Sequence, residues 1–460
     1  MNLVYGIHDK PKFPQLLIFA FQQVLAILAA TIAVPAIIGN GMSQSAALFG
    51  AGVGTLVYQL FTKFKSPVYL GSSFAFLGSM GAAFAGAVST AAGFAGLFIG
   101  TAFAGLVYVV IALVIKGVGV KWLEKLMPAA VVGPTVAIIG LSLAKNAVGD
   151  LFAGKVMVES VGQVIQDGAI VDSVSYVSGC SPYVALICGL ITLFAVMLFS
   201  VYGKKMMKLI PFVLGILVGY VAATIFTVIG IATNNVALQV INFSVFKGLQ
   251  IFAVPEFTFI KALEGIKEID GAYIATLAVA FVPVAFVVFA EHIADHKNLS
   301  TVIGQDLLKE PGLHRTLLGD GVGSIAGAFF GGCPNTTYGE SVGCVAITRN
   351  ASVITITAAA LMCIVISFFG PFVTFLASIP NCVMGGVCFA LYGFIAVSGL
   401  KMVQKVDLNQ SKNLFVVSVI LIAGIGGLTL TFGQVALTSV ACALLLGIGT
   451  NLLLSRGKEE

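Results

Sequence analysis

Four carboxylic acids stand in largely apolar sequence between residues 291 and 340. They are Glu291, Asp295, Asp320 and Glu340. A carboxylate inside a membrane costs on the order of 3 kcal/mol and normally serves a substrate, an ion or a proton. If this part of the chain crosses a membrane, these four residues are its candidate functional groups.

Glu291 and Asp295 are four residues apart, so on a helix they share one face. Two carboxylates this close disfavour joint ionisation, and at least one of them should hold a proton near neutral pH. This spacing suits proton coupling. Asp320, within "LLGDGVGS", is expected near one end of its span as an interfacial or capping residue.

Two histidines alternate with these acids in the motif "EHIADH". Neighbours along a helix face apart, so we expect His292 and His296 at the surface or in packing, outside any proton relay. The motif is not HExxH and predicts no zinc site. We expect no metal and no cofactor, with the proton as the coupling ion.

Composition places these residues in a lipid bilayer. Of 460 residues, 59% are hydrophobic and 9% charged, against about 45–50% and 25% in soluble domains, and the mean hydropathy is +1.07. The chain is therefore predicted to be an all-α polytopic membrane protein. The net charge of +5 gives no sign of a nucleic-acid partner. The sequence contains no Walker A motif and no nucleophile with a base at a useful spacing, so we do not expect an enzyme.

The chain contains about fourteen apolar runs that are roughly long enough to cross a bilayer. We expect spans near 14–38, 45–62, 67–86, 90–115, 128–146, 183–203, 209–232, 271–293, 317–332, 334–348, 352–378, 380–400, 413–430 and 434–455. With both termini cytoplasmic, all but five of the 24 basic residues fall in cytoplasmic segments. The exceptions are Lys145, Lys155, Lys247, Lys261 and Lys267. We expect a multi-pass protein of the cytoplasmic membrane.

A faint internal repeat relates the two halves. "MPAAVVG" at 127–133 and "IPNCVMG" at 379–385 open spans five and twelve, seven apart, so the halves would insert in opposite orientations. Spans three and ten each contain an interrupted segment led by proline, at 67–80 and 334–347. Close helix packing is one interpretation. The other is a pair of broken helices whose ends hold a ligand, with Glu340 at the start of a half-helix.

Several motifs resemble the nucleobase–ascorbate transporter family, and within it the bacterial uracil permeases. They are "FAEHIADH", "DLLKEPGLHR", "PNTTYGESVGCVAITR", "PVYLGSSFAF" and "KNLFVVSVILIAGIGG". The resemblance implies a 7+7 inverted repeat of fourteen spans, with short extended strands in spans three and ten. It implies a core domain (1–115 and 269–378) and a gate domain (116–268 and 379–460). The substrate would lie between them, and the family suggests a homodimer through the gate domain.

The resemblance also implies roles for individual residues. Glu291 and Glu340 would hydrogen-bond the base, while Phe74, Tyr338 and Gly339 would pack on its ring or offer backbone amides. The site would also include Ser341. Further candidates are Gln23, Ser73, Thr337 and Asp320, and Gln23 could instead form an interhelical hydrogen bond.

The substrate has alternatives. The expected function is proton-coupled uptake of uracil by alternating access, with Glu291 or Asp295 carrying the proton. Asp295 stands where uracil permeases usually have histidine, and Ser341 where the family favours asparagine, so xanthine or another oxopurine is the second choice. An anion transporter of the same fold is the third and least favoured choice. An anion carrier should place a cation at its site, whereas the site region here has carboxylates and no Lys or Arg before Arg349.

Overall fold

The structure is a computed structural model that describes residues 3–119, 121–166, 169–204, 206–432 and 435–455. By their contacts these residues form two compact units. Unit 1 contains residues 1–143, 252–369 and 391–460, and unit 2 contains residues 144–251 and 370–390. The expected core and gate domains have other boundaries and stay a prediction.

Unit 1 holds both interrupted segments and all four candidate acids. Its elements are α1 (Phe13–Ile38), α2 (Gln44–Phe61), β1 (Leu70–Ser72), η1 (Phe74–Phe76), α3 (Leu77–Ala85), α4 (Thr90–Val118), α5 (Lys121–Leu126), α6 (Ala129–Ser142), α11 (Thr258–Gly265), η4 (Ile266–Glu268), α12 (Gly271–Ile303), η5 (Leu308–Gly312), α13 (Leu313–Gly331), β4 (Asn335–Thr337), α14 (Gly339–Thr348), α15 (Val353–Ile366), α18 (Ser411–Ile425), β5 (Leu430–Phe432), β6 (Val435–Leu437) and α19 (Ser439–Leu454).

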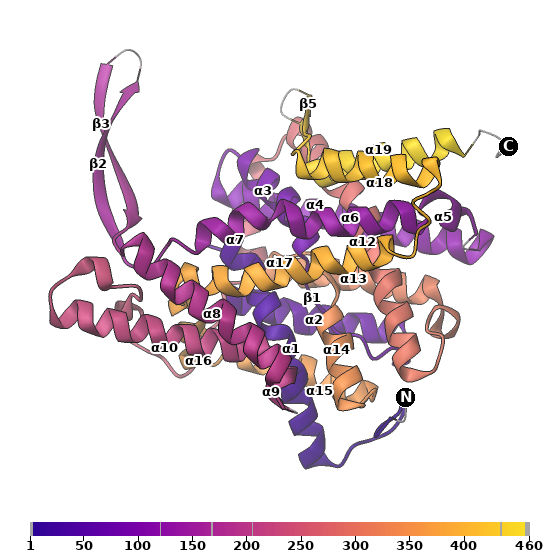
Figure 1. The fold of residues 1–460 in the computed structure, drawn as a ribbon, viewed down its shortest axis with the longest axis horizontal. Coiled ribbons are helices and arrows are strands. Elements are labelled where there is room, and N and C mark those ends of the chain that lie inside the picture. Colours follow the sequence, from indigo (N-terminus) through magenta and orange to yellow (C-terminus); the bar gives the residue numbers. More distant parts are fainter. Residues whose placement is uncertain (1–2, 120, 167–168, 205, 433–434, 456–460) are drawn as a thin grey trace. The chain divides into compact units, whose positions relative to one another are not determined.

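Unit 2 is built on a pair of packed helices and carries a long β-hairpin (Figure 1). Its elements are α7 (Ala144–Asp150), β2 (Met157–Gln166), β3 (Ala169–Ser178), α8 (Pro182–Tyr202), α9 (Met206–Leu209), α10 (Pro211–Ala232), η2 (Val236–Leu238), η3 (Phe243–Phe246) and α16 (Gly370–Ser378). The unit boundary falls within α17 (Asn381–Val403). Strands β2 and β3 pair antiparallel, from Met157 opposite Ser178 to Gln166 opposite Ala169.

The helices follow the expected spans closely, with two differences. Seven helices of the described residues are long and apolar enough to cross a membrane, and shorter apolar helices add to them. Helix α12 runs to Ile303, ten residues beyond the expected end. It ends at Gly304, whose left-handed conformation (φ 73°) suits glycine at a helix C-terminus. The expected span 352–378 is broken into α15 and α16.

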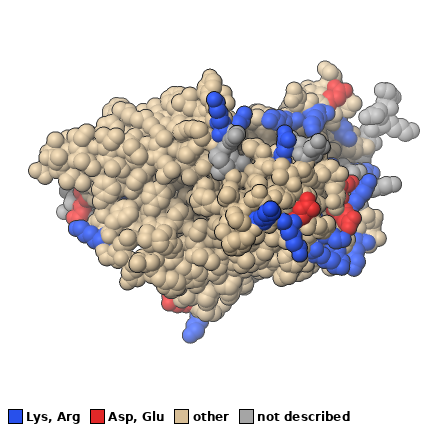
Figure 2. Space-filling view, turned by 90° about the horizontal axis from the view of Figure 1, so that it is seen from below, with Lys and Arg blue, Asp and Glu red and all other residues tan. Residues whose placement is uncertain are grey.

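Apolar side chains also cover much of the outer surface. On α4, Leu106, Val110 and Leu113 are each more than half exposed and lie on one helix face. In the view of Figure 2, uncharged surface predominates, and Lys and Arg gather in a few groups. In water such a surface would be costly, whereas lipid accommodates it.

Glycines allow α2 and α13 to pack with their backbones in contact. A Cβ added to Gly50 would lie 2.4 Å from the carbonyl oxygen of Gly327, and one added to Gly323 would lie 2.7 Å from that of Gly54. Small residues of this kind are typical of close helix pairs in membranes. The pair supports the site because α13 leads directly into β4.

We expect Gly50→Ala to destabilise the protein, because neither backbone can yield to the added methyl group. Overpacking of this kind costs about 1–3 kcal/mol. The measurement is the thermal unfolding temperature of the purified protein in detergent. Gly81→Ala, in α3, is the matched control, because a Cβ there meets nothing within 4 Å. Equal unfolding temperatures for the two variants would contradict the prediction.

Candidate functional site

Two short strands join the interrupted segments at the centre of unit 1. Strands β1 and β4 pair antiparallel, with Leu70 opposite Thr337 and Ser72 opposite Asn335. All six strand residues are buried. Extended backbone is tolerated at membrane depth only where protein covers it and its polar groups are paired. This arrangement confirms the strands expected in spans three and ten.

Each strand is followed by a short helix that begins at the site. Strand β1 leads into η1 and α3, and β4 leads into α14. The Ser73 amide donates to the Pro334 carbonyl (2.9 Å), and the Tyr338 amide donates to the Tyr69 carbonyl (3.2 Å). Glu340 lies in the first turn of α14, where the first amides of a helix have no partner within the helix. The predicted position of Glu340 at the start of a half-helix is therefore confirmed.

Three of the four candidate acids lie near one another around the start of α14. Glu291 is within electrostatic range of Asp295 and Glu340 and, more weakly, of Asp320. Glu291 and Glu340 are partly exposed, and Gly339 between Tyr338 and Glu340 is exposed, although its neighbours in β4 are buried. The two glutamates are therefore open to a small ligand, whereas most polar groups around them are covered.

Asp295 is held by the strand opposite. The hydroxyl of Thr337 donates to Asp295 Oδ2 at 2.8 Å, and both side chains are buried. The Oδ1 atom of Asp295 would lie 3.6 Å from a Cβ on Gly339. Thr337, a candidate for substrate contact, thus connects β4 to α12 through Asp295.

Aromatic rings border the same region. Tyr338 is 4% exposed, and its hydroxyl donates to the Ser72 carbonyl at 2.8 Å. Its ring lies over Gly71, where a Cβ would come within 2.5 Å of it. Phe74 lies edge-on to Tyr392, with 5.6 Å between ring centres. The structure therefore brings both predicted aromatic residues next to the paired strands.

The remaining candidates are buried. Gln23 on α1 donates from its side-chain amide to the hydroxyl of Ser341, and Nε2 lies 3.5 Å from the Ser341 carbonyl oxygen. Gln23 therefore forms an interhelical hydrogen bond, and because its partner Ser341 is itself a site candidate, a role of Gln23 in the site stays a prediction. Ser73 is 1% exposed, and its hydroxyl has no hydrogen-bond partner among the described residues.

These groups can recognise a small planar polar ligand. The carboxylates of Glu291 and Glu340 accept hydrogen bonds, and the first amides of α14 donate them. Hydrogen bonds with a charged partner are about twice as strong as neutral ones. A ring that carries both N–H and C=O groups matches this set, and Phe74 and Tyr338 supply aromatic surface beside it.

Comparison with known proteins defines the family. Residues 14–432 match the sequence profile described as the permease family. The chain belongs to this family. Its relatives include the uracil permease of Bacillus subtilis (strain 168), 37% identical over 460 residues, which cover 99% of the permease described here and 96% of the relative. The uracil permease of Escherichia coli (strain K12) is 33% identical over 450 residues, covering 97% and 93%. The resemblance inferred from the motifs is confirmed.

Solved structures show the same fold. The transmembrane domain of a cyanobacterium bicarbonate transporter, BicA, matches with a TM-score of 0.62 at 16% identity, over 97% of the permease and all of that chain. Murine solute carrier 26 member A9, an anion transporter in the inward-facing state, matches with a TM-score of 0.64 at 12% identity, over 97% and 69%. The permease therefore has the 7+7 fold of these membrane proteins, and its family membership indicates a transporter.

Asp320 lies elsewhere than expected. It is the eighth residue of α13, fully buried, and neither interfacial nor a cap. Its Oδ2 lies 2.7 Å from Nδ1 of His292, and Nε2 of His292 lies 3.0 Å from the Thr316 hydroxyl. Asp320 therefore pairs with His292, the residue that follows Glu291 on α12, and its role at the substrate site stays a prediction.

Neither histidine is at the surface, because α12 continues past them. His296 is also fully buried. Its Nδ1 donates to the His292 carbonyl at 2.8 Å, which leaves Nε2 of a neutral ring to accept from Tyr58, 2.7 Å away. The Tyr58 hydroxyl also lies 2.8 Å from that of Ser66. We call Asp320, His292, His296, Tyr58 and Ser66 the histidine network.

Sequence reasoning missed this network, although one signal was present. His292 and His296 are four residues apart and so share one helix face, which differs from the face that carries Glu291. Two polar residues on one face of a long apolar helix need buried partners. The partners on α2 and α13 are distant in sequence, and only the packed structure identifies them.

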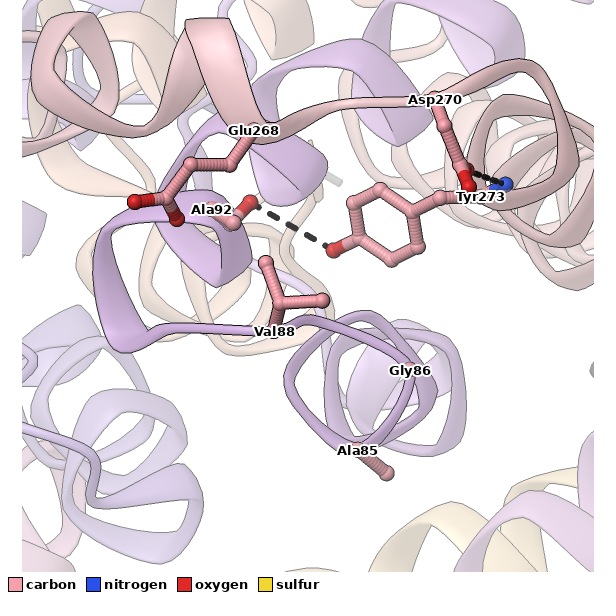
Figure 3. Close-up of a pocket in the computed structure, with 7 residues that line it drawn as sticks. All are labelled: Ala85, Gly86, Val88, Ala92, Glu268, Asp270 and Tyr273. Carbon is pink, nitrogen blue, oxygen red and sulfur yellow. Dashed lines mark hydrogen bonds between the residues drawn. The ribbon is translucent and has the colours of Figure 1, made fainter.

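A separate pocket lies at the other end of α12. It has a volume of about 390 Å³ and is lined by Glu268, Asp270 and Tyr273, among others (Figure 3). Its carboxylates already have partners: Asp270 accepts from the Tyr273 amide at 2.7 Å, and Glu268 accepts from the Ser89 hydroxyl. Tyr273 precedes Glu291 by eighteen residues, roughly 27 Å along a helix. This pocket is therefore distinct from the site formed by Glu291, Asp295 and Glu340.

Proposed function

We propose that this permease takes up uracil together with protons by alternating access. The observation that carries the proposal is the pair of partly exposed glutamates, Glu291 and Glu340, beside the first turn of α14. The names of the relatives agree, since those at 33–38% identity are called uracil permeases. A relative from Escherichia coli (strain K12) at 30% identity is called a putative pyrimidine permease.

Uracil fits the donors and acceptors of the site. Its ring presents N–H and C=O groups in alternation. Glu291 and Glu340 would accept from the N–H groups, and the first amides of α14 would donate to a carbonyl oxygen. Phe74 and Tyr338 would cover the ring. A base with another donor pattern would leave buried groups unpaired, which is the strongest kind of discrimination available to such a site.

Proton coupling would arise from the same acids. Glu291 and Asp295 lie one turn apart on α12 within electrostatic range of each other. Adding a proton to one of them removes a repulsion and so favours the substrate-bound arrangement. Asp295 would communicate with the strand pair through Thr337. The core domain would then move against the gate domain and release the base and the proton on the cytoplasmic side. The protein would lie in the cytoplasmic membrane with both termini on the cytoplasmic side.

The test is uptake of radiolabelled uracil by cells that lack their own permease and express this one. Competitors in excess are unlabelled xanthine, thymine and ascorbate, and a parallel arm contains a protonophore. We expect saturable uptake that collapses with the protonophore and resists xanthine. Uptake of labelled xanthine in place of uracil would instead make Asp295 and Ser341 the marks of an oxopurine permease. Uracil uptake indifferent to the protonophore would refute the coupling.

A further inference from the structure

The residues that precede α1 are attached to the end of the helix that carries Glu340. We call residues 3–9 the N-terminal strap. The Val4 amide donates to the Arg349 carbonyl at 2.8 Å, the Ala351 amide donates to the Tyr5 carbonyl at 2.9 Å, and the Val353 amide donates to the Ile7 carbonyl at 3.0 Å. These bonds form a short parallel ladder on the segment between α14 and α15.

One strap side chain is buried against α14. Ile7 is 7% exposed and packs in an apolar cluster with Val342 and Val345, which lie on one face of α14. The cluster also contains Leu299 of α12 and Leu307. The strap therefore belongs to the same apolar cluster as the helix with Glu340 and the end of the helix with Glu291.

The strap is fixed to α1 as well. The Tyr5 hydroxyl donates to Gln15 Oε1 at 2.6 Å, and the Tyr5 ring lies edge-on to Phe19, 6.0 Å away. Further along α1, Gln23 bonds to Ser341 of α14. Helices α1 and α14 are thus joined twice, by Gln23 near the site and by the strap at the far end.

Helix α14 needs this second attachment because it is short. Its ten residues span roughly 15 Å, with β4 at one end and Arg349 in a left-handed conformation (φ 56°) at the other. A rigid segment of this length transfers a displacement at its end to its first turn. Removing the strap would also unpair the Arg349 carbonyl and the Ala351 and Val353 amides.

We propose that the N-terminal strap is a positioning element of the substrate site, holding α14 in the arrangement in which Glu340 binds the base. The inference rests on the proposed function for its ligand. It assigns a role in affinity to Tyr5 and Ile7, which lie outside the site. By linkage, a ligand that favours the ordered arrangement of α14 must in turn stabilise the strap.

The test compares two substitutions in the strap of the full-length protein. Ile7→Asp places a charge in the cluster against α14. Val4→Asp makes the same kind of change at a side chain that is 59% exposed and is the matched control. For Ile7→Asp we expect the Kd for uracil, measured on purified protein, to rise roughly fivefold or more, the lower end of ordinary coupling between sites. Val4→Asp should bind as the wild type does.

Backbone hydrogen exchange tests the linkage between uracil and the strap, because ordinary structural support would not make exchange at the strap depend on the ligand. Uracil should slow exchange of the Ala351 and Val353 amides in the wild type, and Ile7→Asp should speed exchange across α14 without any ligand. If Ile7→Asp does not accumulate, Ile7→Ala and Ser352→Ala replace it. The latter removes the hydroxyl that donates to the Asp9 carbonyl at 2.6 Å.

The outcomes separate the two proposals. A wild type that binds no uracil refutes the proposed function, while the exchange of α14 in Ile7→Asp still tests the strap. A wild type that binds uracil, with Ile7→Asp or its replacements binding equally well and exchanging at the same rate, overturns the strap as a positioning element.

Discussion

Glu340→Ala is expected to abolish specific uracil uptake while the protein still reaches the membrane. The carboxylate would accept from a ring N–H in a site that is only partly exposed. A hydrogen bond to a charged group contributes about 1.5–3 kcal/mol, and the unpaired N–H of the base adds a penalty. Together these predict a fall in affinity of roughly tenfold to several hundredfold.

The measurement is uptake of labelled uracil normalised to the amount of protein in the membrane. Glu264→Ala is the control, because Glu264 is exposed on α11. Glu340→Gln is informative because it keeps an acceptor oxygen without the charge, so we expect activity between wild type and Glu340→Ala. Uptake by Glu340→Ala at the wild-type rate would remove Glu340 from the site.

Asp320→Ala is expected to produce the largest loss of stability. Asp320 and His292 are both 0% exposed and 2.7 Å apart. Removing one partner of a buried hydrogen bond costs about 1–3 kcal/mol, and more where a charged group is involved, because the other partner is left unpaired. The His292 carbonyl also accepts a hydrogen bond from His296, which in turn bonds to Tyr58 of α2. The connections of α12 to α13 and α2 would therefore weaken together.

The expected observation is a much lower unfolding temperature in detergent, or failure of the variant to accumulate. Asp320→Asn keeps an oxygen that can accept from His292 Nδ1–H, so its loss should be small. Combining Asp320→Leu with His292→Leu removes both polar groups and should recover part of the stability lost in Asp320→Ala. If Asp320→Ala unfolds at the same temperature as Asp320→Asn, the pair does not stabilise the packing of α12.

Hydropathy and motif spacing predicted the membrane class, the approximate spans and the interrupted segments. These features depend on local sequence: apolar length decides what can cross a bilayer, and Pro334 marks where a helix cannot continue. The position of Glu340 at the start of a half-helix followed from the same reasoning.

Partners across helices could not be predicted in this way. Asp320 was expected near a helix end, and its actual partner, His292, is 28 residues away on another helix. Thr337 was named as a further candidate for the site, and its bond to Asp295 was not foreseen. In each case the residue type indicates that a buried polar side chain needs a hydrogen-bond partner. Which group supplies that partner depends on how the helices pack against one another. The roles assigned to Glu291, Phe74 and Tyr338 stay predictions.

The most direct measurement for the central claim is equilibrium binding of radiolabelled uracil to the purified protein, with unlabelled uracil or xanthine as competitor. We expect saturable binding that excess uracil displaces, that xanthine does not displace, and that Glu340→Ala loses. Binding of xanthine without binding of uracil would contradict it, and so would uracil binding that survives in Glu340→Ala.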